Sequence, residues 1–283
     1  MIEKVNPSHP DKVADRIAGA IVDLAYEKSE DAPKIAVEVL IGHENCTIIC
    51  ETSIKLNLND IKKIVKRIVG KEVENINYVE VPQDVELAKN QEGGVRTGDN
   101  GIFKGVPVNE EEKYLSSIAR DLYSRYQCDG KYILDEKTNT LIICQSNVNS
   151  LDLLRYVQAK YCDISLFKIN PLGEWSGGIN VDTGATNRKL GSDMGRAITG
   201  GGLIGKDLSK SDVSINIMCH LLAQKTKCVV TTYCAIGDTD ITFTFDDEDK
   251  QQLVMTYKEV VDSAKNYVDS IGGFEKLAEW GLI

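Results

Sequence analysis

The chain repeats one order of predicted elements three times, at intervals of about a hundred residues. The first helix of each repeat begins near Pro10, Glu110 or Ser211, and two strand-like runs and a second helix follow it. One such unit covers only one face of its small sheet with helices, so the other face needs another unit or another chain. We therefore predict an α+β fold of three quasi-equivalent helix–strand–strand–helix units around a pseudo-threefold axis, divided as 1–105, 106–175 and 176–283.

Hydrophobic periodicity predicts the elements of each unit. They are helix 10–26, strands 34–41 and 47–54 and helix 60–69; then helix 110–126, a hairpin of strands 131–134 and 140–145 and helix 150–161; and finally helix 211–224, strands 228–236 and 240–245 and helix 249–268. Strand 47–54 carries apolar side chains on both faces, which favours an oligomer.

Composition excludes several classes of protein. The formal charge of −10 argues against a nucleic-acid-binding surface, so any anionic ligand must be met by a local basic patch. No apolar run is long enough to span a bilayer, and residues 1–5 do not resemble a signal peptide. The eight cysteines lack the spacing of a metal site. We expect free thiols rather than disulfides, in a reducing cytoplasm, with Cys46 and Cys50 on one buried strand face.

The segment from Gly200 to Asp212 has the composition of a phosphate-binding loop. Three consecutive glycines let the backbone approach a ligand, while Lys206 and Asp212 could meet phosphates and Mg²⁺. The segment also matches the spacing of a P-loop. However, Asp207 stands where a P-loop has Ser or Thr, and residues 188–199 are too polar for the buried strand that should come first. We therefore predict that it is not a P-loop; a Gly-rich surface loop remains the alternative.

The first helix opens with His9 and Asp11 at its N-terminus, where unpaired N–H groups and the helix dipole favour phosphate. Ser8 is the expected N-cap, and Pro10 suits the first helical turn. Asp212 has the same place in the third unit, so the two aspartates could bracket one polyphosphate with two Mg²⁺ ions. Simple helix capping is the alternative for each aspartate.

Further candidates lie between these two points, and several have an ordinary structural alternative. The loop 93–101 is either a binding loop or a hinge, and Lys131 is either a ligand-binding or a strand-edge lysine. Trp175, in a Gly-rich turn, could stack on a base or fill a small core. The other candidates are Asp129, Arg188 and Lys189.

Taken in order, these pieces resemble the motifs of the S-adenosylmethionine synthetase (methionine adenosyltransferase) family. The matching segments are Glu3 with His9-Pro10-Asp11-Lys12 (similar to GHPDK), Gly98-Asp99-Asn100-Gly101 (GAGDQG), 182–189 (GDAGLTGRK) and 200–212 (HGGGAFSGKDPxKVD). Glu38 and Glu51 keep the spacing of two family glutamates, and Asp129-Gly130-Lys131 resembles the family's nucleotide-contacting Asp-x-Lys. The resemblance runs over nearly the whole chain.

The resemblance implies adenosyl transfer from ATP to L-methionine, with two Mg²⁺ and one K⁺, in a homodimer (or a tetramer built from it) whose active sites lie between subunits. It implies catalytic roles for His9, Lys131, Arg188 and Lys206; ATP binding by these four with Asp129, Trp175, Asp182 and Lys189; methionine binding by Glu51, Gln91, Asp99, Asp182 and Lys210; Mg²⁺ binding by Asp11 and Asp212; and K⁺ binding by Glu38. The main alternative is a non-catalytic, nucleotide-binding partner that regulates a longer synthetase. A P-loop-type kinase is the third possibility.

Overall fold

The computed structural model describes residues 1–83, 89, 94–199 and 201–283. Its strands are β1 (Ile2–Val5), β2 (Ile35–Gly42), β3 (Glu44–Thr52), β4 (Val73–Pro82), β5 (Gly101–Gly105), β6 (Gly130–Asp135), β7 (Thr140–Gln145), β8 (Leu166–Ile169), β9 (Gly184–Ala185), β10 (Val230–Cys234), β11 (Asp240–Phe245) and β12 (Gln252–Thr256). Its helices are α1 (Pro10–Lys28), α2 (Leu58–Val69), α4 (Glu110–Arg125), α5 (Ser150–Lys160), α6 (Leu190–Met194), α7 (Ser211–Thr226), α8 (Tyr257–Ile271) and α9 (Phe274–Trp280).

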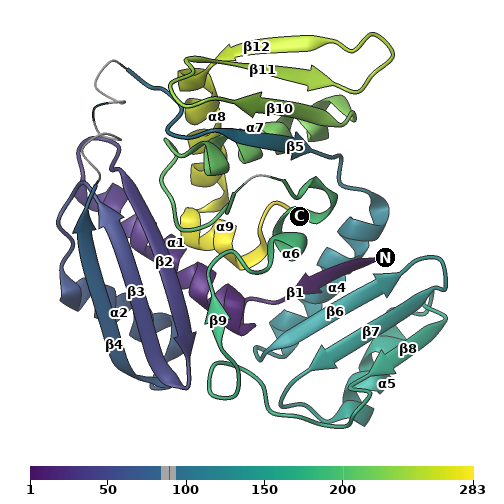
Figure 1. The fold of residues 1–283 in the computed structure, drawn as a ribbon. Helices are drawn as coiled ribbons and strands as arrows, with labels where there is room; N and C mark the ends of the chain where they lie inside the picture. The colour runs from purple at the N-terminus through teal and green to yellow at the C-terminus, as the bar shows by residue number, and fades with distance from the viewer. Residues whose placement is uncertain (84–88, 90–93, 200) are drawn as a thin grey trace.

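Three four-stranded sheets surround a central group of helices that includes α1, α6 and α9 (Figure 1). The first sheet has the order β4-β3-β2-β9, the second β1-β6-β7-β8 and the third β12-β11-β10-β5. This arrangement confirms the predicted α+β class with three related units.

Each sheet takes one edge strand from a distant part of the chain. The N-terminal strand β1 pairs with β6, β5 pairs with β10, and the short β9 pairs with β2 (Figure 1). The sheets therefore cross the predicted boundaries, since β1 and β5 both lie within 1–105 but belong to the second and third sheets. Backbone hydrogen bonds thus lock the three units to one another.

The last element of the third unit differs from the prediction. Helix 249–268 is wrong at its start, because Gln252–Thr256 forms β12 and α8 begins only at Tyr257. Strand β12 pairs antiparallel with β11, and Thr256 then caps α8 in a capping box with Glu259. The helical pattern therefore does not extend back to residue 249. Strands β4 and β8, which pair parallel with β3 and β7, are absent from the prediction.

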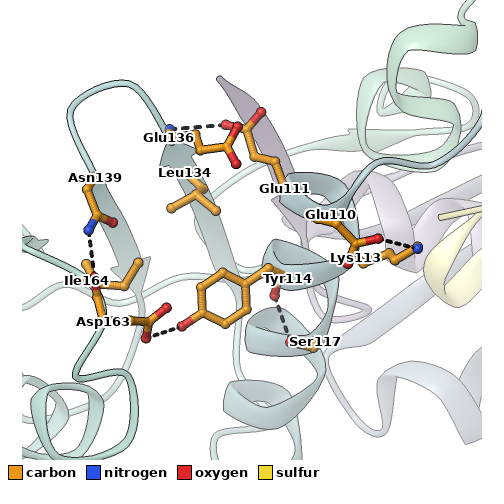
Figure 2. A pocket seen from close by; sticks show the side chains of 10 residues that line it. All are labelled: Glu110, Glu111, Lys113, Tyr114, Ser117, Leu134, Glu136, Asn139, Asp163 and Ile164. Carbon is orange, nitrogen blue, oxygen red and sulfur yellow. Dashed lines mark hydrogen bonds and ion pairs between the residues drawn. The ribbon is translucent and has the colours of Figure 1, made fainter.

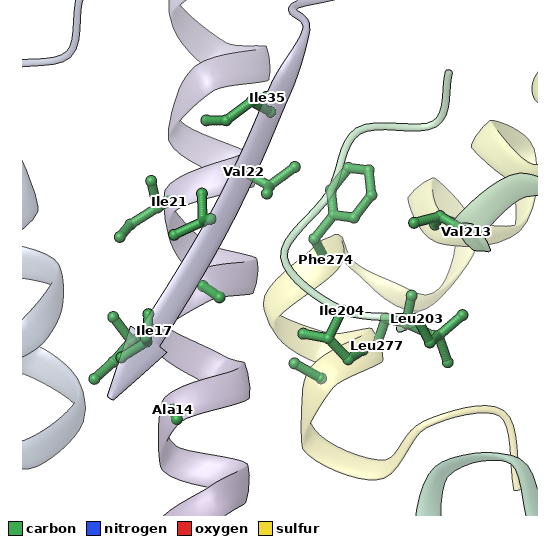
Figure 3. Close-up of a cluster of buried hydrophobic side chains, with 14 of the residues drawn as sticks. Ala14, Ile17, Ile21, Val22, Ile35, Leu203, Ile204, Val213, Phe274 and Leu277 are labelled. Atoms are coloured by element: carbon green, nitrogen blue, oxygen red, sulfur yellow. The ribbon is translucent and has the colours of Figure 1, made fainter. Parts of the chain in front are cut away.

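Helix α1 lies at the centre of the largest hydrophobic core. It packs against β2 through side chains such as Ile17, which is fully buried, and against α9. Gly19 allows the close approach of α9, because a Cβ there would lie 2.6 Å from the Phe274 carbonyl oxygen. Figure 3 shows Leu203 and Ile204, from the Gly-rich segment, packed beside α9 in the same core.

Two sequence-based expectations can be compared directly with the fold. No helix among the described residues combines the length and the apolar character needed to cross a membrane. The eight cysteines are all free thiols, and Cys46 and Cys50 lie buried on one face of β3 as predicted.

Gly105, at the end of β5, is expected to tolerate no side chain. A Cβ there would lie 2.0 Å from the carbonyl oxygen of Cys219 in α7. We predict that Gly105→Ala lowers the free energy of unfolding by about 2–3 kcal/mol, as overpacked interiors do, measured by urea denaturation. Gly98→Ala is the control, because nothing lies within 4 Å of its added Cβ. Equal losses in the two variants would contradict the close packing of β5 on α7.

Candidate active site

The N-terminus of α1 is capped by a histidine. His9, not the predicted Ser8, is the N-cap, because the Asp11 N–H donates to His9 Nδ1 at 3.2 Å. Ser8 Oγ instead donates to the Gln127 carbonyl. Since Nδ1 accepts a hydrogen bond, the neutral imidazole carries its proton on Nε2. Burial, and after it the charge of Lys189, lowers the pKa of His9 to about 4, so the ring is neutral at pH 7.

Asp11 is buried in the first turn of α1 and is contacted from residues 185–189. Its Oδ1 accepts the Ala185 N–H at 2.9 Å, and its Oδ2 lies 2.8 Å from Lys189 Nζ. The Arg188 guanidinium lies 3.5 Å from Oδ1. Burial alone would raise the pKa of Asp11, but the hydrogen bonds from Lys189 and Ala185 outweigh it and hold that pKa below its ordinary value. The structure thus brings the predicted Arg188–Lys189 pair to His9 and Asp11.

Asp129 and Trp175 lie next to each other across Gly177. A Cβ on Gly177 would be 2.6 Å from the Trp175 ring and 2.9 Å from the Asp129 carboxylate, so only glycine fits there. Trp175 Nε1 donates to Asn170 Oδ1 at 3.1 Å, which orients the partly exposed indole. Burial raises the pKa of Asp129 to about 6, against the hydrogen bond that its carboxylate accepts from the Gly178 N–H.

Lys131 lies on β6, beside β1 and near the N-terminus of α1. Its Nζ is 3.0 Å from a carboxylate oxygen of Glu3 on β1. The charges of Lys131 and Asp182 both act on the imidazole of His9, which places them in the same region. We name this group the His9 cluster; it consists of His9, Asp11, Asp129, Lys131, Trp175, Asp182, Arg188 and Lys189.

A second group lines a separate cavity of about 370 Å³ at the N-terminus of α7. We name it the Lys206 cluster; it consists of Asp99, Lys206, Lys210 and Asp212. Lys206 Nζ lies 2.7 Å from Asp212 Oδ2, and Lys206 forms an isolated β-bridge with Ala36. Gly201 lets the backbone pass this carboxylate, because a Cβ there would lie 2.2 Å from Asp212 Oδ2.

The element before the glycines confirms that this segment is not a P-loop. Helix α6 and a short 3₁₀ turn, Gly195–Ala197, come before it in place of a buried strand. Gly200 itself lies outside the described residues.

Two further predicted residues lie on the first sheet. Glu38 and Glu51 share the open face of the first sheet, where Glu38 accepts a hydrogen bond from the Thr186 hydroxyl. Gln91 lies outside the described residues. Of the predicted methionine ligands, Asp99 and Lys210 thus line one cavity, and Glu51 is paired on β3 with Ala36, which lines the same cavity.

The side chains of the two clusters do not contact each other directly in the described part of the chain. Among the described residues, no ion pair or hydrogen bond joins a side chain of the His9 cluster to one of the Lys206 cluster. Cavity size does not identify the site either. A cavity of about 700 Å³ lies between α4 and the β6–β7 hairpin, and none of the predicted site residues lines it (Figure 2).

The sequence reasoning missed a buried ionic group beneath the His9 cluster. Lys12 Nζ lies 3.0 Å from Asp15 Oδ2 and 2.5 Å from Asp193 Oδ1, and all three side chains are fully buried. The spacing of Lys12 and Asp15, three apart on a helix, is a local signal for this pair. Asp193, on α6, has no such signal. The sequence reasoning also gave no role to Asn187, which has a left-handed backbone and directly precedes Arg188 and Lys189.

The carboxylates fit the Mg²⁺ roles that the resemblance implies. Mg²⁺ prefers oxygen ligands and takes one or two carboxylates with phosphate oxygens and water. Asp11 and Asp212 each supply one carboxylate next to lysines, and the glycine at position 201 leaves the backbone beside Asp212 bare. Among the described residues no cluster of three or more His, Cys, Asp or Glu side chains is arranged for a metal. Any Mg²⁺ here therefore depends on ligand oxygens.

Comparisons with known proteins identify similar sequences and a similar fold. A sequence model of the S-adenosylmethionine synthetase N-terminal domain matches residues 1–92. The S-adenosylmethionine synthase of Mycoplasma capricolum subsp. capricolum is 28% identical, with 78% of this chain and 71% of that protein covered. That of Paramagnetospirillum magneticum is 27% identical, with 83% and 76% covered. The structure of an unusual S-adenosylmethionine synthetase from Campylobacter jejuni matches all of this chain and 94% of its own, with a TM-score of 0.77 at 19% identity.

The raised pKa of Asp129 gives a prediction about stability. The folded pKa of about 6 exceeds the unfolded value of 3.8, so the folded state is penalised once this carboxylate ionises. The penalty is absent below the unfolded pKa, grows as the pH rises and is complete above the folded pKa. We predict that Asp129→Asn is more stable than the wild type by about 3 kcal/mol near pH 8 and nearly equal to it near pH 3.5.

Urea denaturation at both pH values measures this difference. Asp152→Asn is the control, because that aspartate is exposed and paired only with Arg155 on the surface of α5. A gain for Asp129→Asn that is the same at both pH values would show that the buried charge is not its cause.

Proposed function

We propose that this chain, a divergent member of the S-adenosylmethionine synthetase family, transfers the adenosyl group of ATP to the sulfur of L-methionine. Triphosphate is released and then hydrolysed to pyrophosphate and phosphate. The observation that carries the proposal is the gathering of His9, Asp11, Arg188 and Lys189 at the N-terminus of α1, with Lys131 nearby.

The His9 cluster suits the leaving group of this reaction. When the bond between C5′ and oxygen breaks, negative charge builds on the triphosphate, and preorganised cations and donors stabilise it. His9 is neutral with its proton on Nε2, so it can donate a hydrogen bond to the departing oxygen. Lys131, Arg188 and Lys189 hold the triphosphate at the helix N-terminus.

The nucleoside end is assigned to Asp129, Trp175 and Asp182. The indole of Trp175 is held by Asn170, and the residue is 37% exposed, so an adenine can stack on it. Asp129 accepts from the Gly178 N–H, and it keeps a carboxylate oxygen available for the nucleotide. Asp182 serves both substrates.

The Lys206 cluster is assigned to methionine and to the far side of the triphosphate. Lys210, Asp99 and Glu51, with Gln91, bind the amino and carboxylate ends of methionine, and Lys206 meets the phosphates. A thioether sulfur attacks without losing a proton, so no general base is needed. Mg²⁺, held by Asp11 and Asp212, would neutralise phosphate charge when bound, and K⁺ would lie at Glu38.

We also propose a homodimer whose active sites lie between subunits, in which the His9 cluster of one chain meets the Lys206 cluster of the other. The lack of a hydrogen bond or ion pair between the two clusters, among the described residues of one chain, supports it. So does the open face of the first sheet, where Leu40, Ile49 and Val79 are each at least 41% exposed. We place this enzyme in the cytoplasm, where its eight free thiols stay reduced.

The activity has a direct test. Purified protein with ATP, L-methionine, Mg²⁺ and K⁺ is expected to form S-adenosylmethionine, pyrophosphate and phosphate, identified by mass spectrometry. No S-adenosylmethionine from the protein alone, with co-purification of a longer synthetase, would favour the regulatory-partner alternative. Formation of ADP with a phosphorylated acceptor would indicate a kinase.

Lys206→Ala separates a catalytic from a structural role. Its ammonium is predicted to hold phosphate, so kcat/KM should fall by at least about a hundredfold, while the free energy of unfolding changes by less than about 1 kcal/mol. Lys276→Ala, which removes an ion pair of a more exposed lysine with Glu279, should change neither quantity. Parallel losses of activity and stability in Lys206→Ala would show that Lys206 is structural.

Mixed dimers test the shared active site. Lys131→Ala and Lys206→Ala remove residues from different clusters, so each variant alone should be inactive as a dimer. After unfolding and refolding of an equal mixture, half of the dimers should be mixed and each should hold one intact site, giving about a quarter of the wild-type activity. No recovery would place both clusters of each site in the same chain.

A further inference from the structure

Asn187 connects the two clusters within each chain. Its backbone is left-handed, with φ of 60°, a conformation that asparagine tolerates better than most residues. Its N–H donates to the fully buried Asp15 Oδ1 at 2.8 Å. Arg188 and Lys189, the two cations that contact Asp11, follow it directly.

The side chain of Asn187 holds the Gly-rich segment by its backbone. Ile204 N–H donates to Asn187 Oδ1 at 2.9 Å, and Asn187 Nδ2 donates to the Ile204 carbonyl at 3.0 Å. The oxygen and the nitrogen of the Asn187 amide are thereby both paired with the backbone of Ile204, as the backbones of two residues pair in a β-sheet. Ile204 lies two residues before Lys206, so this pairing fixes the position of the backbone that leads into the Lys206 cluster.

The absence of a side chain at Gly202 leaves room for this contact. A Cβ on Gly202 would lie 2.4 Å from Cγ of Asn187, and its three nearest neighbours are all atoms of the Asn187 side chain. The Gly-rich segment thus has a glycine where the amide of Asn187 crosses it. On its other side the segment is anchored independently, because Leu203 and Ile204 pack into the core near α9 (Figure 3).

We propose that Asn187 is a positioning residue that sets Lys206 and Asp212 relative to Arg188 and Lys189. The inference rests on the proposed function, in which one triphosphate is held by Arg188 and Lys189 of one chain and by Lys206 and Asp212 of the other. In the proposed homodimer the two clusters of a chain serve different active sites. The pairing of Asn187 with Ile204 therefore also links the two sites through one rigid backbone connection.

Asn187→Gly isolates the side chain, because glycine keeps the left-handed backbone and the N–H bond to Asp15. The control is Asn139→Gly, which removes another asparagine of positive φ whose Nδ2 donates to the Asp163 carbonyl, near the β6–β7 hairpin. We expect amide exchange at Ile204 to speed up by about tenfold or more in Asn187→Gly, with no change in Asn139→Gly. At similar melting temperatures, kcat/KM should fall about tenfold only in Asn187→Gly.

A double-variant cycle tests the contact with Gly202. Gly202→Ala should reduce kcat/KM and speed Ile204 exchange by forcing the Asn187 amide away. In Asn187→Gly/Gly202→Ala the clash is gone, so the double variant should be no worse than Asn187→Gly alone. Additive losses, or Ile204 exchange that is unchanged in Asn187→Gly, would overturn the proposal.

Failure of the proposed function would be seen separately. If the wild type forms no S-adenosylmethionine, the exchange measurements still decide whether Asn187 holds the segment. Calorimetry with tripolyphosphate and Mg²⁺ then replaces kinetics as the functional readout. Asn187→Gly should bind this probe about tenfold more weakly than the wild type and Asn139→Gly equally well; equal affinity in all three proteins would overturn the positioning role.

Discussion

The approach of β9 to the first turn of α1 is the contact on which the candidate site depends. A Cβ at Gly184 would lie 2.0 Å from the Pro10 carbonyl oxygen, so the two backbones touch. This approach lets the Ala185 N–H reach Asp11 and the Asn187 N–H reach Asp15. Without it, the cations that follow β9 would have no fixed place beside His9. A two-residue strand therefore positions Arg188 and Lys189 beside Asp11.

The buried ions below this contact hold α6 to α1. Removing charges from water is costly unless the partners are close and their remaining groups are paired. Here Lys12 contacts two carboxylates, and Asp15 also accepts the Asn187 N–H. Because Asp15 on α1 and Asp193 on α6 contact the same lysine, the distance between the two helices is fixed. The arrangement fixes the direction in which residues 185–189 leave the core, which hydrophobic packing alone specifies less tightly.

The sequence predicted the parts of the fold that depend on interactions between residues close to one another in the chain. The first helix of each unit and the hairpin of β6 and β7 follow from side-chain periodicity and turn residues, and the structure has them. The exchanged strands β1, β5 and β9 have two to five residues each and pair with distant segments, so no local pattern reveals their partners. The same holds for the site. Residue types indicated phosphate and metal chemistry, but Asp193 and Ile204 meet their partners only through the fold.

Charge balance explains how an acidic chain can bind a polyphosphate. Three lysines assigned to the triphosphate are each paired with a carboxylate in this structure: Lys131 with Glu3, Lys189 with Asp11, and Lys206 with Asp212. Two of these carboxylates are the assigned Mg²⁺ ligands. A triphosphate with its Mg²⁺ ions offers phosphate oxygens to the lysines and cations to the carboxylates together. The Lys189–Asp11 and Lys206–Asp212 pairs would each be exchanged for two new ones, so these four charges would keep a partner when the triphosphate binds.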